Sequence, residues 1–279
     1  MVTLRPSDTA TAAGGVLPGI AMGESMLDLY TWDPNSNSGK PIFALKEKGV
    51  AFDYHYINLL EFEQHSPEYV KINPGGTVPT LIHDDVIFTE STPMCEYIDG
   101  VFDGPSLRPE DPMQRYRMRW WCWYIDNRFA PALSVIGWHV FMGPMVRKKS
   151  PEEIERIIAR IPTKERRIAW TTAVNTGFTE EQLENAGERV NDGIQLMNAR
   201  LAESDYLAGP TYSLADTITF ANAYALPVSV PQFATEEKAP HYMAWLKRIY
   251  RRPATREAFE MGRTQLAARA LDIIEKLEA

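Results

Sequence analysis

The spacing of hydrophobic residues changes character once along the chain, and this change limits the possible folds more than any other feature. Up to about residue 102, segments with alternating apolar residues are interleaved with segments of helical spacing. Beyond residue 112 only helical spacing recurs. The segment between them, DGPSLRPEDP at 103–112, contains three prolines. The sequence therefore predicts an α/β unit at 26–104, a linker at 105–112 and an all-helical unit at 113–279.

The first unit is predicted to run strand, helix, strand, short helix, strand, strand, helix. MLDLYTW and FDYHYINLL alternate as strands, and VPTLIHDD and VIFTE are two further strands joined at Asp84 and Asp85. KPIFALKEKGV has helical spacing and ends at Gly49, a residue typical of helix C-termini. Before it, TWDPNSNSGKP is expected to be a polar turn. We expect a compact α/β unit of about eighty residues.

The second unit is predicted to contain helices only. The segments with helical spacing are 113–142, 150–160, 178–204, 213–224 and 238–276. A charged helical insertion is expected at about 143–188. Its stretch from Arg147 to Trp170 mixes charges of both signs, which is typical of a solvated helix pair. The alternative is that this insertion borders a pocket or a partner subunit.

The charge and hydropathy of the chain exclude several classes of partner. A formal net charge of −8 and a pI near 5.3 give no basic surface for nucleic acid or anionic membrane. No run approaches the roughly 18 apolar residues of a membrane helix. Residues 1–25 are interpreted as a flexible leader because they lack the apolar centre of a signal peptide.

Cysteine and histidine usage indicates a protein of a reducing compartment, which we take to be the cytoplasm. Cys95 and Cys122 are the only cysteines, too few for a disulfide framework. The five histidines show no metal-ligand spacing, so we expect no metal site.

Pro79 stands directly before a predicted strand, where a proline removes a ladder donor and needs a special reason. If the Val78–Pro79 bond is cis, the backbone of Val78 faces outward and can pair with an extended peptide. The sequence thus predicts a peptide-binding edge at Val78 and Pro79.

Glu90 and Ser91 lie where the following strand ends and a helix begins. The free N–H groups of the helix start and the Ser91 hydroxyl suit a carboxylate, and Glu90 can accept from an ammonium group. The pair would therefore bind the head of an α-amino acid. The alternative is that Glu90 and Ser91 only cap the helix.

Together these motifs resemble the glutathione transferase superfamily over residues 26–270. The resemblance rests on NPGGTVPTL, TES and YSLADTITF, in which Ser213 and Asp216 fit a capping box. It implies a thioredoxin-like N-terminal domain and an all-α C-terminal domain, with glutathione as co-substrate. Further segments, including NSNSGKP, FEQHSPEYVKINPGG, TESTPMCEYI and SVIGW, are most similar to bacterial glutathione-dependent β-aryl etherases.

The resemblance also implies roles for individual residues. Ser38 is expected to donate a hydrogen bond that favours the glutathione thiolate, with Asn37 as second donor; alternatively both only cap the helix. Gln64 and His65 are expected to reach the glycine end of glutathione, unless they lie in an exposed loop.

An aromatic face is the candidate acceptor site, expected in the cleft between the domains. Its members would be Trp32, Trp120, Trp123, Tyr124 and Trp138. The opposite face of the same helix, with Met118, Trp121, Ile125 and Phe129, is the predicted core face. The alternative is that the five aromatic residues serve packing or dimer contacts.

The expected activity is attack of glutathione thiolate on the β-carbon of a lignin-derived α-keto β-aryl ether, which releases a phenol. The alternatives are a general glutathione transferase, a glutathione-disulfide reductase, or a non-catalytic partner subunit. The resemblance implies a dimer, either a homodimer or a heterodimer with a related chain. Stereochemical preference stays open at this point.

Overall fold

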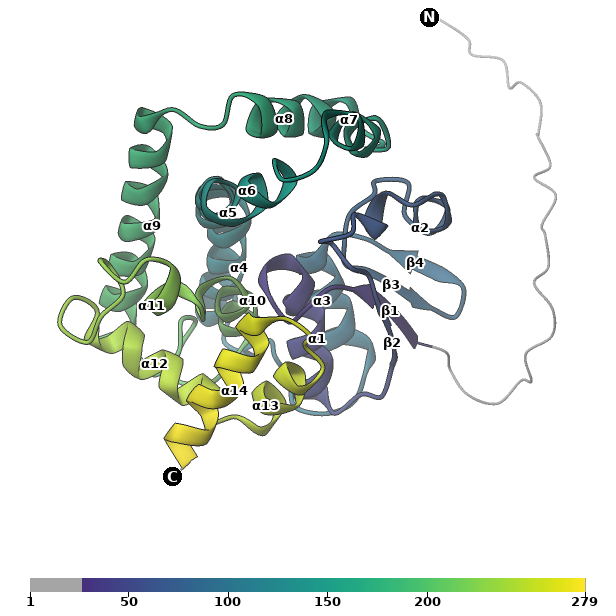
Figure 1. Cartoon of the computed structure of the whole chain (residues 1–279). Helices are drawn as coiled ribbons and strands as arrows, with labels where there is room; N and C mark the ends of the chain where they lie inside the picture. Colours follow the sequence, from purple (N-terminus) through teal and green to yellow (C-terminus); the bar gives the residue numbers. More distant parts are fainter. Residues whose placement is uncertain (1–26, 279) are drawn as a thin grey trace, which may run out of the picture.

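The computed structural model describes residues 27–278, so the expected leader at 1–25 lies outside the described residues. Figure 1 shows a small sheet on one side of the molecule and a larger helical part on the other, with α1 and α3 between them. The predicted α/β thioredoxin-like unit followed by an all-helical unit is confirmed.

A four-stranded mixed sheet forms the edge of the first unit. Its strands are β1 (Leu27–Thr31), β2 (Asp53–Tyr56), β3 (Thr80–His83) and β4 (Val86–Phe88), in the spatial order β2-β1-β3-β4. β1 pairs in parallel with β2 and antiparallel with β3, and β3 pairs antiparallel with β4. The acidic turn between β3 and β4 is confirmed, with Asp84 and Asp85 at φ of 47° and 67°.

The helices of the first unit are α1 (Ser36–Lys48), the short 3₁₀ helix η1 (Glu63–His65), α2 (Pro67–Ile72) and α3 (Ser91–Val101). Gly49 ends α1 in the left-handed conformation, as predicted. The expected polar turn is shorter than predicted, because α1 already begins at Ser36 and includes Asn37 and Ser38. With its N-cap position at Asn35, the first turn of α1 is built from the polar residues themselves.

The second unit contains one long helical run and a series of shorter helices. The run comprises α4 (Pro112–Tyr124), η2 (Ile125–Phe129), α5 (Ala130–Gly137), η3 (Trp138–Met142) and α6 (Gly143–Val146), in which η2 and η3 are π-helical. The later helices are α7 (Pro151–Ala159), α8 (Lys164–Asn175), α9 (Glu180–Leu201), α10 (Leu214–Ala223), α11 (Leu226–Ser229), α12 (Pro240–Tyr250), α13 (Pro253–Glu260) and α14 (Gln265–Glu278).

The single helical segment expected at 238–276 is three helices. Pro253 cannot continue a preceding helix, so α12 ends at Tyr250 and α13 begins at Pro253. α13 ends before Gly262, where a Cβ would lie 2.3 Å from that of Ala267. Because the helical spacing of apolar residues continues through 238–276, it did not reveal the two points at which the helix ends and a new one begins.

The prediction that no run reaches membrane-spanning length is wrong for residues 112–146. This run contains an 18-residue window of mean hydropathy 1.4 with at most two charged residues, and 22% of the window is buried. Glycine, proline and histidine interrupt its apolar residues without adding charge, which conceals the hydropathy of the window. A helix of a soluble protein can have the same composition, so this property alone assigns no membrane.

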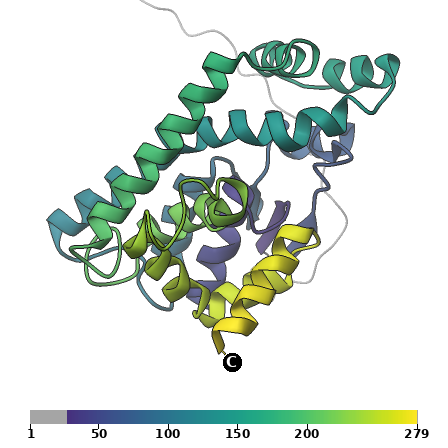
Figure 2. The same ribbon diagram turned by 60° about the vertical axis from the view of Figure 1, so that its left-hand side comes forward.

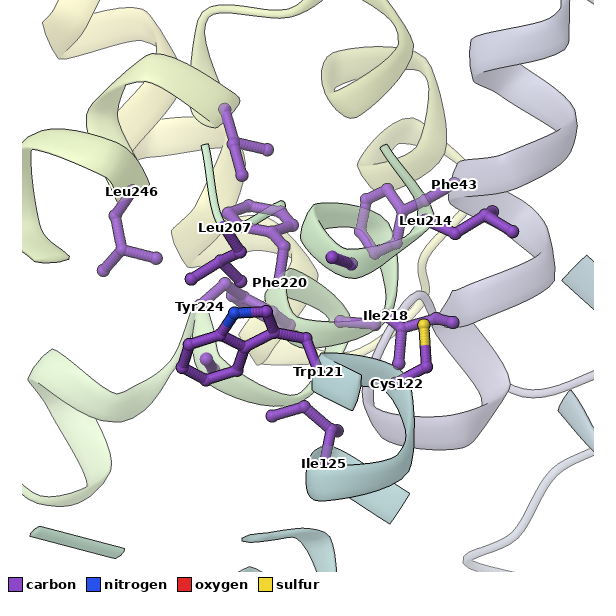
Figure 3. Close-up of a cluster of buried hydrophobic side chains, with 14 of the residues drawn as sticks. Phe43, Trp121, Cys122, Ile125, Leu207, Leu214, Ile218, Phe220, Tyr224 and Leu246 are labelled. Atoms are coloured by element: carbon purple, nitrogen blue, oxygen red, sulfur yellow. The ribbon is translucent and has the colours of Figure 1, made fainter. Parts of the chain in front are cut away.

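One hydrophobic core joins the two units. Phe43 of α1 lies 5.4 Å, between ring centroids, from both Phe220 of α10 and Phe259 of α13. Figure 3 shows Phe43 and Phe220 close to Trp121 and Cys122 of α4. The predicted core face of this helix is confirmed, because Met118, Trp121, Ile125 and Phe129 are all buried.

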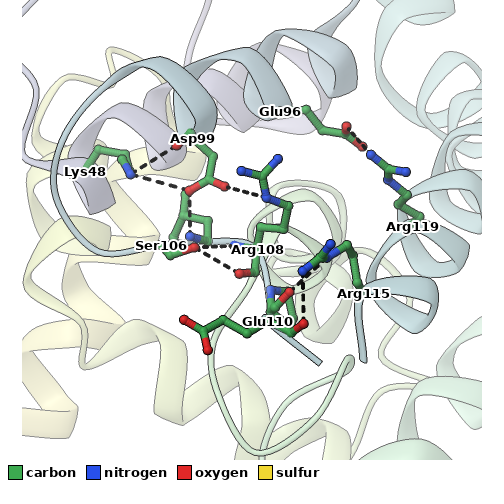
Figure 4. Close-up of polar contacts among 10 residues, drawn as sticks. Lys48, Glu96, Asp99, Ser106, Arg108, Glu110, Arg115 and Arg119 are labelled. Carbon is green, nitrogen blue, oxygen red and sulfur yellow. Dashed lines mark hydrogen bonds and ion pairs between the residues drawn. The ribbon is translucent and has the colours of Figure 1, made fainter. Parts of the chain in front are cut away.

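Polar contacts fix the segment between the units to α1 and α3. Lys48 donates to the carbonyl of Asp99 at 3.3 Å and pairs with the Asp99 carboxylate at 3.5 Å. The same carboxylate accepts from the N–H of Leu107 at 2.7 Å and lies near Arg108 (Figure 4). The irregular segment from 102 to 111 is thereby held against the first unit.

Candidate glutathione site

The first turn of α1 brings Ser38 to the end of β1. The Thr31 hydroxyl donates to the Ser38 carbonyl at 3.1 Å, and Ser38 is 4% exposed. Among the described residues, the Ser38 hydroxyl has no hydrogen-bond partner. Asn37 is exposed, so only Ser38 presents a sheltered donor. Because the N-cap position is Asn35, neither residue is the helix cap.

Two contacts that the sequence did not indicate fix this turn. Asp33 accepts from the N–H groups of Arg263 at 3.0 Å and Thr264 at 2.8 Å, and from the Thr264 hydroxyl. Gly39 packs on the turn so closely that a Cβ would lie 2.6 Å from the carbonyl carbon of Pro34. The position of Ser38 thus depends on the segment between α13 and α14 and on a glycine.

The second part of the site lies where β3 and α3 begin. The Val78–Pro79 bond is cis, as anticipated. Ser91 is the first residue of α3 and is buried, whereas Glu90 is exposed with φ of 66°. The Glu90 side chain makes no capping bond, which argues against the simple cap interpretation. A non-glycine residue held at positive φ costs free energy and is typical of functional sites.

Gln64 and His65 lie in η1, and the alternative that they occupy an exposed loop is wrong. They are 4% and 2% exposed. The Gln64 Oε1 atom and both ring nitrogens of His65 are buried and have no hydrogen-bond partner among residues 27–278. Burial, with Arg166 and Arg160 adding to it, lowers the pKa of His65 to about 4, so the imidazole is neutral at pH 7.

The charged insertion covers this part of the site. Arg160, which follows α7, donates to the His65 carbonyl at 3.4 Å, and the ring of Trp170 on α8 lies 5.4 Å from that of His65. Gly76 is so close to Pro162 that a Cβ would lie 2.9 Å from its ring. In Figure 2, α7 and α8 extend past the end of the long helical run as a separate arm. The interpretation that the insertion borders a site is therefore favoured over a purely solvated helix pair.

A second hydrophobic cluster holds the insertion in place. It contains Phe62, Val146, Ile161, Trp170 and Val174, with Trp138, Met142, Ile154 and Ile157 packed against it. The ring centroids of Phe62 and Trp170 are 5.6 Å apart. Phe62 has φ of 60°, so the backbone immediately before Gln64 is also held in the left-handed region.

The structure does not bring the five predicted acceptor-site residues to one wall. Trp120 and Tyr124 stack on each other at 5.2 Å, and the Tyr124 hydroxyl points towards α9. Trp123 is 49% exposed beside Arg128, and Trp138 contacts Trp170 at 4.7 Å. Only Trp32 lies in the turn before α1, with its buried indole N–H unpartnered. The helical pitch of α4 and the π turn of η2 distribute these rings over different faces.

Lys40 is a buried residue of the site region that sequence reasoning missed. Its side chain is fully buried, with Nζ 2.5 Å from Asp126 of η2 and 3.5 Å from the Thr92 hydroxyl. It therefore links the first turns of α1 and α3 to the helical unit. A lysine in an apolar helical pattern ordinarily indicates solvent, and no local signal distinguishes this one.

Two surface pockets of about 440 Å³ lie away from Ser38. One is between α5 and the start of α9, lined by residues such as Val135, Gln182 and Arg189. The other lies between α7 and the loop with Phe62, and includes Lys149 and Arg160. We place the candidate site by its converging polar groups, because these carry the chemistry and pocket size alone does not.

A thioredoxin-like sheet joined to a helical unit, with polar groups gathered at the starts of α1, η1 and α3, is the architecture of a thiol-peptide transferase. The model for the glutathione S-transferase N-terminal domain matches residues 29–106, and that for the C-terminal domain matches 163–253. The chain belongs to the glutathione S-transferase family, and glutathione is its co-substrate.

Among particular relatives, the chain is similar to protein LigF of Sphingobium sp. strain SYK-6. The two are 40% identical over 245 residues, which cover 86% of this chain and 95% of the relative. The crystal structure of β-etherase LigF superposes with a TM-score of 0.81 at 39% identity, covering 84% of this chain and 99% of that one. Glutathione transferase F7 from Populus trichocarpa superposes with a TM-score of 0.65 at 25% identity, covering 84% and 98%.

Proposed function

We propose that this protein is a glutathione-dependent β-etherase that cleaves the β-aryl ether bond of lignin-derived α-keto aryl ethers. The observation that carries the proposal is the 40% identity to LigF over 95% of that protein, whose crystal structure is described as a β-etherase. The match covers 86% of this chain and is therefore not confined to the glutathione-binding unit.

The proposed reaction is a nucleophilic displacement. The glutathione thiol loses its proton, the thiolate forms a bond to the β-carbon, and the C–O bond breaks with its electron pair on the phenolate oxygen. The phenolate then takes up a proton. The adjacent ketone withdraws electron density from the attacked carbon, so catalysis requires chiefly an ionised thiol and two positioned reactants.

Ser38 is assigned as the thiolate donor, and Asn37 as a secondary one. A thiol with a pKa near 8.5 is only a few per cent ionised at neutral pH, and a hydrogen bond to the thiolate lowers that pKa. Ser38 is buried and Asn37 is exposed, which supports Ser38 in this role better than Asn37. Val78, Pro79, Glu90 and Ser91 would hold the peptide backbone and α-amino acid head of glutathione, and Gln64 and His65 its glycine end.

Among the aromatic candidates, Trp32 is the acceptor-site residue that the structure supports best. It precedes Ser38 by six residues, and its buried indole N–H lacks a partner. Trp120, Trp123, Tyr124 and Trp138 would contribute through packing.

We further propose a dimer in the cytoplasm. Apolar side chains on β4, α3 and α4 are exposed, namely Val86, Ile87, Val101, Met113 and Tyr116. They would be covered by a second copy, and light scattering on the purified chain measures its mass directly. Cys95 and Cys122 are buried free thiols, which suits a reducing compartment.

The test is phenol release from each enantiomer of a guaiacyl keto-ether, with and without glutathione. We expect glutathione-dependent release from one enantiomer and loss of most of the rate in Ser38→Ala. Release from neither enantiomer, by folded protein that binds glutathione, contradicts the proposal. Faster turnover of a disulfide or a chloroarene than of the ether would instead identify a reductase or a general transferase.

A further inference from the structure

In the part of the chain that the structure describes, the guanidinium of Arg166 in α8 has no carboxylate partner. It is half-buried, and burial lowers its pKa. Among residues 27–278, no carboxylate lies within salt-bridge distance of its guanidinium, although neighbouring arginines such as Arg160 and Arg167 donate to backbone carbonyls. A desolvated charge without a partner is unfavourable, so such an arginine indicates a site completed by an anion.

Several buried polar groups of η1 and of the start of α8 also have no hydrogen-bond partner among the described residues. Both ring nitrogens of His65 and Oε1 of Gln64 are buried and lack partners. The hydroxyl of Thr163, three residues before Arg166, is buried without a partner as well. Arg166 acts electrostatically on His65. A carboxylate accepts several hydrogen bonds at once, and a guanidinium, a neutral imidazole and a hydroxyl can supply them.

The place of this cluster fits one end of an extended peptide ligand. Gly76 lies against Gln64, since a Cβ on Gly76 would be 3.2 Å from the Gln64 carbonyl oxygen. Val78 follows two residues later, and Tyr69 fixes the intervening turn by donating to the Thr77 carbonyl at 2.6 Å. A peptide residue paired with Val78 therefore has its C-terminal neighbour beside Gln64 and His65.

We propose that Arg166 binds the glycine carboxylate of glutathione, so that the inserted helix pair contributes a charged residue to a site otherwise built by the first unit. This inference rests on glutathione being the co-substrate, and not on the ether being the acceptor. Trp170 lies on the same helix as Arg166, and its ring contacts with Phe62 and His65 hold this helix against η1. The insertion thus determines which thiol-peptides bind.

The test compares the dissociation constants of glutathione and its glycine monoethyl ester, measured by tryptophan fluorescence. The two ligands differ at the glycine carboxyl alone, which is an anion in glutathione and an uncharged ethyl ester in the other ligand. We expect wild type to bind glutathione about tenfold tighter or more, the effect of one charged hydrogen bond. Arg166→Met should reduce this ratio to near one, and Arg166→Lys should retain part of it.

Lys164→Met is the matched control, because Lys164 is an exposed cation on the same helix. It should leave the ratio unchanged. If folded Arg166→Met has the same ratio of dissociation constants as wild type, the proposal is overturned. It is also overturned, without any variant, if wild type binds both ligands equally. Phenol release is measured separately, so loss of the etherase assignment would leave the binding ratio intact.

Discussion

At the scale of single residues, the site is built from polar groups that the fold leaves without partners. Among the described residues, Gln64 and His65 have buried side-chain atoms without a hydrogen-bond partner. Ser38 is buried, and Arg166 is half-buried without a carboxylate partner in the same part of the chain. Leaving such groups unpaired costs stability, and a bound ligand can recover that cost. The sequence predicted three of these four, because they lie in motifs; Arg166 lies in a charged stretch where nothing local separates it from its neighbours.

Replacing Ser38 by alanine should raise the thiol pKa of bound glutathione by about one to two units, since it removes a hydrogen bond to a charged sulfur. Ultraviolet absorbance of the thiolate across a pH titration measures this directly. Asn37→Ala is the matched control and should change the pKa far less, because Asn37 is exposed. Equal shifts in the two variants would contradict the assignment of Ser38 as first donor.

His65 should make stability depend on pH. Its pKa of about 4 in the folded protein lies below the usual 6.5, so the unfolded chain binds a proton that the folded chain does not. The contribution to stability is complete above pH 6.5 and is lost as the pH falls towards 4. Denaturant unfolding of wild type and His65→Gln should therefore give a stability difference that varies across this window. A difference independent of pH would contradict the assignment.

At the scale of elements, periodicity predicted most strands and helices but not where closely spaced helices break. The succession of strands along the chain, the acidic turn and the C-terminus of α1 follow from local sequence patterns. The start of α1 at Ser36, the split of 238–276 and the scattered aromatic rings of α4 to η3 depend on tertiary contacts. Lys40 shows the limit of prediction from local patterns, because its burial depends on Asp126, which lies 86 residues away in the sequence.

Gly39→Ala should destabilise the protein by about 2 kcal/mol or more, since the new Cβ meets the backbone of Pro34 and cannot be relieved by a side-chain rotation. The control is Gly187→Ala in α9, where a Cβ meets nothing within 4 Å. That variant should gain about 0.5–1 kcal/mol from helix propensity. Chemical denaturation of both variants measures the two effects, and a neutral Gly39→Ala would show that the turn can move.

At the scale of the whole molecule, two contacts between the units position the site. The larger is the shared core around Phe43, and the smaller is the cluster around Phe62 and Trp170. The first places the start of α1 against the helical unit, and the second places the insertion over η1. Their presence could not be read from the sequence, because aromatic residues in a helical pattern do not indicate which element they meet.

Phe43→Ala should lower the free energy of unfolding by about 3–5 kcal/mol and leave a single unfolding transition, because the ring packs on helices of the second unit. Val140→Ala, at an exposed position of η3, should change it by less than about 0.5 kcal/mol. Circular dichroism and tryptophan fluorescence followed together would detect independent unfolding of the two units. Two separate transitions in wild type would contradict a shared core.

The two π-helical turns of the run at 112–146 also affect how its sequence can be aligned with the corresponding helix of a related protein. Each π turn accommodates about one residue more than an α-helical turn, so every residue after it is rotated by about 100° relative to an uninterrupted helix. Trp138 meets Trp170 only with η2 in place before it. If this helix is aligned without a gap to a helix that lacks η2, the residues paired after η2 would face different neighbours in the two proteins.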